Sequence, residues 1–120
     1  MKRDKKLQTT TESTIGYDQL LEVVESYYDN GQLDSRINYK DDKLDGLSEI
    51  WYENGQLELR TNYKNGKLDG LYEVWYANGQ LLERVNYTDD KLDGLYESWY
   101  DNGQLKLRTN YKNGKLGRVS

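Results

Sequence analysis

Residues 46–69 read GLSEIWYENGQLELRTNYKNGKLD, and a closely similar stretch begins again at Gly70 and at Gly94. The single Trp of each copy therefore recurs every 24 residues, and a weaker copy precedes them at residues 22–45. The second and fourth copies agree at 19 of 24 positions. A fixed period of this kind indicates a repeat architecture in which each unit stacks on its neighbours.

Each copy contains two candidate turns. The first is Asn-Gly-Gln-Leu, which begins at Asn30, Asn54, Asn78 and Asn102. The second lies eleven residues later and is Asn-Gly in two copies and Asp-Asp in the other two. Asn-Gly between alternating apolar residues predicts a two-residue type I′ turn, because both central residues need positive φ, which Asp tolerates less well than Gly. We therefore expect an all-β fold: a single-layer, twisted antiparallel meander of about eight short strands, built from four 24-residue hairpin repeats over residues 20–117.

Two-residue turns would also fix which residues share a face of the sheet. The first turn predicts the pairs Tyr52–Leu57, Trp51–Glu58 and Glu49–Arg60, and the second turn predicts Leu59–Tyr72 and Leu57–Val74. One face, here the Tyr–Leu face, then carries Ile50, Tyr52, Leu57, Leu59, Thr61, Tyr63, Leu68, Tyr72, Val74 and Tyr76. We take it as the main packing surface.

The opposite face, here the Trp–Glu–Arg face, places a Glu opposite an Arg in every copy. Its candidate partner-binding residues are Trp51, Trp75, Trp99, Arg60, Arg84, Arg108, Glu49, Glu73 and Glu97. An exposed cross-strand ion pair contributes only roughly 0.2–1 kcal/mol, so its expected effect is to hold register. The Trp row is open to two interpretations. It shields the backbone and stacks on Arg, or it is an interface, since Trp, Tyr and Arg dominate binding hot spots.

Composition excludes most catalytic chemistry. The chain has no His and no Cys, so His-based acid–base catalysis, thiol nucleophiles and ordinary zinc sites are absent. Adjacent carboxylates occur only as turn pairs such as Asp41-Asp42, whose side chains diverge into solvent. We predict no enzyme activity, no cofactor and no metal site. No long apolar run is present, so we expect neither a signal peptide nor a membrane span, and a cytoplasmic protein.

The two ends of the chain differ from the repeats. Residues 1–19 are polar and begin with a basic stretch, so we predict a flexible N-terminal tail, with a short helix before the first repeat as an alternative. Residues 118–120 are predicted as a C-terminal tail. The last strand, over residues 105–111, is expected to present an open edge with which a second copy can pair as a homodimer.

The repeat resembles a known family. Gly-Leu-Tyr-Glu-x-Trp-Tyr-x-Asn-Gly-Gln-Leu, followed by Arg-x-Asn-Tyr-x-x-Gly-Lys-Leu-Asp-Gly, is similar to the bacterial variant of the MORN repeat and to chains classed as antitoxin components of toxin–antitoxin modules. The resemblance covers residues 20–117. It implies a single-layer meander of hairpins that binds other macromolecules without catalysis. Eukaryotic MORN repeats are associated with lipid headgroups and scaffolding.

Charge indicates the kind of partner. Residues 22–117 contain 18 Asp and Glu against 12 Lys and Arg. An acidic aromatic surface is poorly suited to direct binding of nucleic acid or of an anionic membrane, where neutralised phosphates supply the affinity. It suits a protein partner with a basic surface.

Three functions follow from these observations. The first is a non-catalytic, antitoxin- or immunity-like protein that neutralises or scaffolds a protein partner. The second is an inhibitor, encoded by a phage or mobile element, that mimics nucleic acid in the channel of a defence effector. The third is a membrane-associated MORN scaffold. Binding of an effector in competition with its nucleic acid, or binding to anionic liposomes, would separate the second and third from the first.

Overall fold

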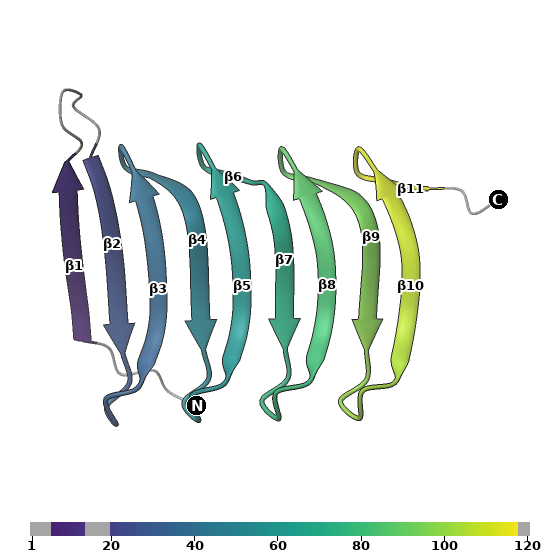
Figure 1. Ribbon diagram of the computed structural model, residues 1–120, viewed down its shortest axis with the longest axis horizontal. Helices are drawn as coiled ribbons and strands as arrows, with labels where there is room; N and C mark the ends of the chain where they lie inside the picture. The colour runs from purple at the N-terminus through teal and green to yellow at the C-terminus, as the bar shows by residue number, and fades with distance from the viewer. Residues whose placement is uncertain (1–5, 14–19, 118–120) are drawn as a thin grey trace.

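The computed structural model describes residues 20–117 in full and the backbone of residues 6–13. The described strands form one open antiparallel sheet whose order follows the sequence (Figure 1). They are β1 (Lys6–Ser13), β2 (Leu20–Tyr27), β3 (Leu33–Lys40), β4 (Lys43–Trp51), β5 (Leu57–Lys64), β6 (Lys67–Leu68), β7 (Gly70–Trp75), β8 (Leu81–Thr88), β9 (Lys91–Trp99), β10 (Leu105–Lys112) and β11 (Lys115–Leu116). No helix occurs among these described residues. The predicted single-layer meander is confirmed, with β2 to β5 and β7 to β10 as its eight repeat strands.

The first strand lies where a flexible tail was predicted. Lys6–Ser13 pair with the whole of β2, from Lys6 opposite Tyr27 to Ser13 opposite Leu20. The tail prediction is therefore wrong for this segment. The Thr-rich strand pairs with the edge that β2 would otherwise expose. The alternative of a helix is also wrong from Leu20 onward, where β2 begins. The other predicted tail residues, 1–5, 14–19 and 118–120, lie outside the described residues.

The upper edge of the sheet in Figure 1 is formed by the second turn of each repeat, and these turns match the prediction. Asn65 and Gly66 have φ of 50° and 83°, as a type I′ turn requires. The Asp pairs adopt the same conformation, with φ of 49° at Asp41 and 66° at Asp42. Two-residue turns therefore form in all four copies, including the two that lack Gly.

The lower edge is formed by the Asn-Gly-Gln turns, and here the prediction is wrong. Gly55 N–H donates to the Tyr52 carbonyl at 2.9 Å, and Tyr52 N–H donates to the Gln56 carbonyl at 2.8 Å, so the loop has three residues. Only Gly55 has positive φ, at 90°. Asn54 instead accepts the Gln56 N–H through its side-chain oxygen at 2.9 Å, an Asx turn that competes with the type I′ conformation.

The longer loop changes the register near the turn. Trp51 pairs with Leu57, Ile50 pairs with Leu59, and Glu58 is the extra residue of a β-bulge. Leu57 therefore belongs opposite Trp51 and not opposite Tyr52 as predicted. The bulge compensates for the extra loop residue, so Glu49 still pairs with Arg60, as expected.

A second irregularity lies near the upper edge. Ile37 pairs with Ser48 and Tyr39 with Leu44, so three residues of β4 face the single Asn38. In the next repeat the same distortion separates β6 from β7, where Gly70 has φ of 118° and a Cβ would lie 3.1 Å from Asn62. Register beyond this point shifts by two residues, and Leu59 pairs with Val74 rather than with the predicted Tyr72. Because a shift of two preserves the faces, this distortion leaves the predicted division of side chains between them unchanged. The exception is Leu57, which the one-residue shift at the bulge places opposite Trp51.

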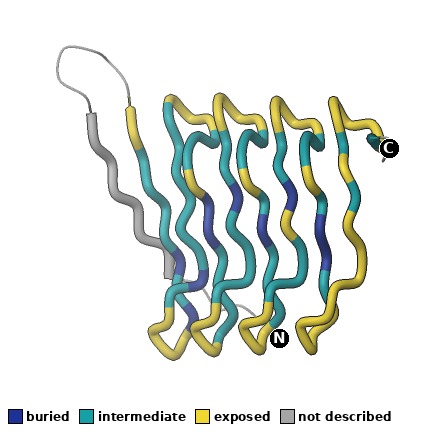
Figure 2. Tube along the Cα trace, turned by 45° about the vertical axis from the view of Figure 1, so that its right-hand side comes forward, coloured by how far each residue is buried: buried dark blue, intermediate teal, exposed yellow. Residues whose placement is uncertain are grey.

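Buried residues lie mainly along the middle of the strands and, in the first repeat, extend down to the lower edge at Tyr28 and Asp34 (Figure 2). Among the described residues, the buried apolar side chains are Tyr28 and Val85, and the other buried residues are polar or charged. Tyr72 and Tyr87 form an edge-to-face pair with ring centroids 5.6 Å apart, and Tyr96 and Tyr111 form another at 5.9 Å. The core is therefore a thin layer under tyrosine rings, as a chain without Phe requires.

Candidate functional site

The Trp–Glu–Arg face carries a continuous row of alternating charges. Glu25, Arg36, Glu49, Arg60, Glu73, Arg84, Glu97 and Arg108 each pair with the next across the sheet, from β2 to β10. The sequence predicted four separate pairs, one in each hairpin. The two-residue shift at the upper edge joins them, because it brings Arg60 opposite Glu73 instead of Leu71. A Gly inside a strand, as at Gly70, was the available signal for that shift.

The two charges of each pair differ in exposure. The Glu73 side chain is 9% exposed, whereas Arg84, whose Nε lies 3.1 Å from the Glu73 carboxylate, is 45% exposed. The same asymmetry recurs in the pairs Glu25–Arg36, Glu49–Arg60 and Glu97–Arg108, at 2.7 to 3.1 Å. The carboxylates therefore lie at the sheet surface and the guanidinium groups cover them. A partner approaching this face meets arginine first.

The Trp row runs beside the charged row. Trp51 lies two residues from Glu49 in β4 and therefore on the same face. The Arg36 guanidinium lies over the Trp51 ring at 5.8 Å, and Arg60 lies over Trp75 at the same distance. Each of these two arginines thus contacts the Trp of the following repeat. The predicted stacking of Arg on Trp is confirmed for Trp51 and Trp75.

All nine predicted binding residues lie on this face, and the three Trp are partly exposed. Leucines on the other side of the charged row add apolar surface, since Leu71 is 45% and Leu95 43% exposed. The face therefore consists of a charged row flanked by an aromatic row and an aliphatic row. These leucines were not among the predicted binding residues.

Side-chain hydrogen bonds tie successive repeats together along the lower edge. The hydroxyl groups of Tyr28, Tyr52 and Tyr76 donate to the carbonyls of Trp51, Trp75 and Trp99, at 2.6 to 2.8 Å. Asn54 and Asn78 donate to the carbonyls of Ala77 and Asp101, each at 2.9 Å. These bonds explain why Tyr and Asn recur in each turn. They hold the Trp strands at fixed spacing.

The Tyr–Leu face contains one carboxylate among tyrosines. Glu83 accepts a short hydrogen bond from the Tyr96 hydroxyl. This bond, with burial and the charge of Glu83, raises the pKa of Tyr96 to about 12. Burial, with Glu83 as a second cause, also raises the pKa of Tyr87 and Tyr72. These tyrosines therefore remain protonated and uncharged at physiological pH.

Net charge is unevenly divided between the two edges. The upper edge, which we call the lysine rim, has seven Asp and seven Lys: Asp41, Asp42, Asp45, Asp69, Asp89, Asp90, Asp93 and Lys40, Lys43, Lys64, Lys67, Lys91, Lys112, Lys115. The lower edge, which we call the acidic rim, has five acidic residues and a single lysine: Asp29, Asp34, Glu53, Glu58, Asp101 and Lys106. The Glu–Arg row is balanced. Most of the excess negative charge of the repeats therefore lies at the acidic rim.

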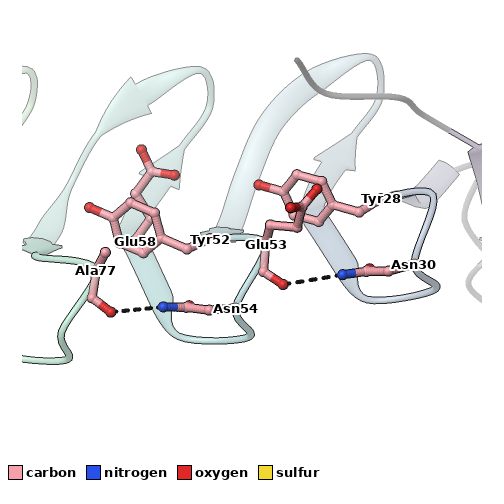
Figure 3. Close-up of a pocket in the computed structure, with 7 residues that line it drawn as sticks. All are labelled: Tyr28, Asn30, Tyr52, Glu53, Asn54, Glu58 and Ala77. Carbon is pink, nitrogen blue, oxygen red and sulfur yellow. Dashed lines mark hydrogen bonds between the residues drawn. The ribbon is translucent and has the colours of Figure 1, made fainter. Parts of the chain in front are cut away.

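The acidic rim is hollowed where the first two repeats meet (Figure 3). The hollow measures about 520 Å³ and is lined by Tyr28, Asn30, Tyr52, Glu53, Asn54, Glu58 and Ala77. Burial raises the pKa of Tyr52, and the charge of Glu58 is the second cause. A smaller hollow of about 350 Å³ at the lysine rim is lined by Lys64, Asn65, Lys67, Asp69 and Asp89, with both signs of charge.

Neither hollow is lined by a Ser, Thr, Cys or His side chain. In the described part of the chain, no group of three or more Asp or Glu side chains is placed to hold a metal ion. The same residues include no helix with the length and apolar character needed to cross a bilayer.

Four stretches of the chain match the family model described as MORN repeat variant: residues 23–41, 44–65, 68–89 and 92–113. These matches cover most of the chain, and the protein belongs to this family. Each matched unit is one hairpin of the sheet, and the 24-residue period is confirmed. The chain is therefore a repeat module, and repeats of this family are generally non-catalytic and commonly bind protein or membrane. No curated protein matches the chain.

Proposed function

We propose that this protein is a non-catalytic binding module that engages a protein partner through the Trp–Glu–Arg face and neutralises or scaffolds it, as an antitoxin or immunity protein does. One observation carries the proposal: Trp and Arg, the residues most enriched in binding hot spots, form adjacent rows on a face that no second layer covers in the described residues.

The dimensions of this face suit a protein partner. The charged row crosses eight strands, a length of about 34 Å at about 4.8 Å per strand. An interface of standard size buries about 800 Å² on each partner, and a surface two or three side chains wide and this long supplies such an area. Because each Arg is already neutralised by a Glu, the row does not repel a basic partner. The acidic rim attracts one.

The test compares capture of proteins from a lysate of the source organism by the wild-type chain and by two variants. Trp75→Ala/Arg84→Ala alters the Trp–Glu–Arg face, and Lys64→Ala/Lys67→Ala alters the lysine rim as a matched control. We expect one protein with a basic surface to be retained by the wild type and the control and to be lost from the face variant. Equal retention by all three would contradict the proposed face.

Two further measurements identify the kind of partner. If the captured protein is toxic when produced alone and harmless when produced with this chain, the antitoxin role is supported. If binding disappears in competition with the nucleic acid of the partner and at high salt, the chain acts instead as an inhibitor that mimics nucleic acid. Binding of the chain to anionic liposomes, without any captured protein, would favour a membrane scaffold and contradict our proposal.

A further inference from the structure

The hollow in the acidic rim lies outside the proposed binding face. None of its lining residues belongs to the Trp or Glu–Arg rows. Tyr28 and Tyr52 supply aromatic surface and Glu53 and Glu58 supply carboxylates, as Figure 3 shows. No Lys or Arg lines it.

The walls of the hollow are held in place before any ligand arrives. The Tyr28 hydroxyl donates to the Trp51 carbonyl at 2.7 Å, and the Tyr52 hydroxyl donates to the Trp75 carbonyl at 2.6 Å. At the turn itself, the Asn54 side chain donates to the Ala77 carbonyl at 2.9 Å. A ligand therefore does not have to order these side chains, which lowers the entropic cost of binding.

The chain contains its own comparison for this site. One repeat later, the positions of Glu53 and Glu58 are occupied by Ala77 and Leu82, although the tyrosines and the asparagines recur. The two carboxylates are thus not needed to form the junction. They give the first junction two carboxylates, whereas the equivalent positions one repeat later include a single carboxylate, Asp101 in the place of Ala77.

We propose that this hollow binds an arginine or lysine side chain from a basic segment of the protein partner. The half-buried Tyr52 ring offers an aromatic surface to a cation, and the carboxylates offer ion pairs at its charged end. The surrounding acidic rim favours the approach of a basic segment and disfavours phosphate groups. This inference rests on the proposed function, because it names the chemistry of the same partner at a second contact.

The first experiment titrates the full-length, isotope-labelled chain with the capped peptide acetyl-Gly-Arg-Gly-amide and follows its backbone amides by NMR. The control peptide carries citrulline, which has nearly the shape of arginine and no charge. We expect saturable shifts at Asn30, Asn54 and Ala77 with the arginine peptide, and binding weaker by about fivefold or more with citrulline. Equal affinity for the two peptides, or no shift at these residues, would overturn the proposal.

Substitutions then test the carboxylates. Glu53→Gln/Glu58→Gln is expected to weaken binding of the arginine peptide by about fivefold. Asp89→Asn/Asp90→Asn removes the same charge from the lysine rim and is expected to change the affinity little. Leu82→Glu, which adds a carboxylate one repeat later without changing a residue that lines the first hollow, is expected to add a second set of shifts, at Asn78 and Asp101. If both charge-removing variants weaken binding equally, the effect is general attraction and the hollow is not a site. The added-carboxylate variant and the citrulline control do not depend on the stability of the Gln variant.

This proposal and the proposed function can fail separately. Loss of the arginine-specific shifts, with capture of the partner still abolished by Trp75→Ala/Arg84→Ala, would refute the hollow and leave the binding face. Arginine-specific shifts, with equal capture of the partner by the wild type and the variants, would support the hollow and refute the binding face.

Discussion

The two rims of the sheet are closed by turns that look alike in the sequence and differ in the structure. Asn65-Gly66 at the lysine rim is a two-residue type I′ turn, with positive φ at both residues. Asn54-Gly55 at the acidic rim is part of a three-residue loop, with positive φ at the Gly alone. The residues after the dipeptide account for the difference, since Gln56 N–H is bound by the Asn54 side chain. An Asn-Gly pair therefore does not define a turn without its neighbours.

The difference between the rims extends to tolerance of substitution. At the lysine rim the second turn residue is Asp in two copies and Gly in the other two, whereas the acidic rim has Gly in all four. Carboxylates and lysines are equal in number at the lysine rim, whereas the acidic rim has a hollow with an excess of carboxylates. The lysine rim thus carries both signs of charge, and the acidic rim carries the hollow that we propose as a site.

The largest expected effect is on the acidic-rim glycine. Gly79 has φ of 91°, and a Cβ would lie 3.3 Å from the Gln56 side-chain oxygen. Gly79→Ala is expected to lower the free energy of unfolding by about 1–2 kcal/mol, measured by urea denaturation. Gly66→Asp, which copies the Asp42 and Asp90 of the same rim, is expected to cost less than about 1 kcal/mol. Equal losses would contradict the distinction between the two turns.

The next effect concerns the hydrogen bonds that join repeats at the acidic rim. Tyr52→Phe removes the bond to the Trp75 carbonyl and is expected to cost about 1 kcal/mol, because that carbonyl loses its side-chain donor. Tyr100 occupies the equivalent place in the last repeat and is 49% exposed, so Tyr100→Phe is expected to change stability by only a few tenths of a kcal/mol. Similar losses at both positions would mean that the hydroxyl bond is not what joins the repeats.

The pKa values of two tyrosines are raised in part by neighbouring glutamates, that of Tyr96 by Glu83 and that of Tyr52, where burial is the larger cause, by Glu58. The pKa of Tyr96 is raised from 10.0 to about 12 by its bond to Glu83 and by burial. A raised pKa in the folded state gives stability that is present below pH 10 and is lost as the pH rises toward 12. Glu83→Gln should lower the pKa of Tyr96, and Glu58→Gln should lower that of Tyr52 alone, as followed by NMR of the tyrosine rings. A pKa for Tyr96 that does not respond to Glu83→Gln would contradict this account.

The smallest effect is expected for the surface ion pair of the lysine rim. Lys67 Nζ lies 3.3 Å from the Asp89 carboxylate, and their side chains are 55% and 71% exposed. Lys67→Ala is expected to change the free energy of unfolding by less than about 0.5 kcal/mol. A larger loss that does not depend on salt would show that the charges of this rim contribute more to stability than exposed ion pairs do.

Periodicity was enough to predict the meander, its eight repeat strands and the two faces. The predicted Glu49–Arg60 pair is correct although the length of the adjacent loop and the register beside it were predicted wrongly, because the three-residue loop and the bulge at Glu58 compensate for each other. The continuous Glu–Arg row was missed, since it depends on a distortion at positions such as Gly70 that the alternation of polar and apolar residues does not report. The strand β1 was missed because a polar, Thr-rich segment carries no apolar periodicity. The hollow was missed because Glu53 and Glu58 adjoin a loop whose length was predicted wrongly.

The most direct measurement of the central claim uses the three Trp residues as probes on the Trp–Glu–Arg face. The chain, labelled with 5-fluorotryptophan, is mixed with the captured partner and observed by ¹⁹F NMR, and each resonance is assigned with a Trp→Phe variant. We predict that the Trp75 resonance shifts or broadens on binding, together with those of Trp51 and Trp99 on the same face. Unchanged Trp resonances in a complex that forms, with shifts instead in a sample labelled with fluorotyrosine, would show that the partner binds the Tyr–Leu face and would contradict the account.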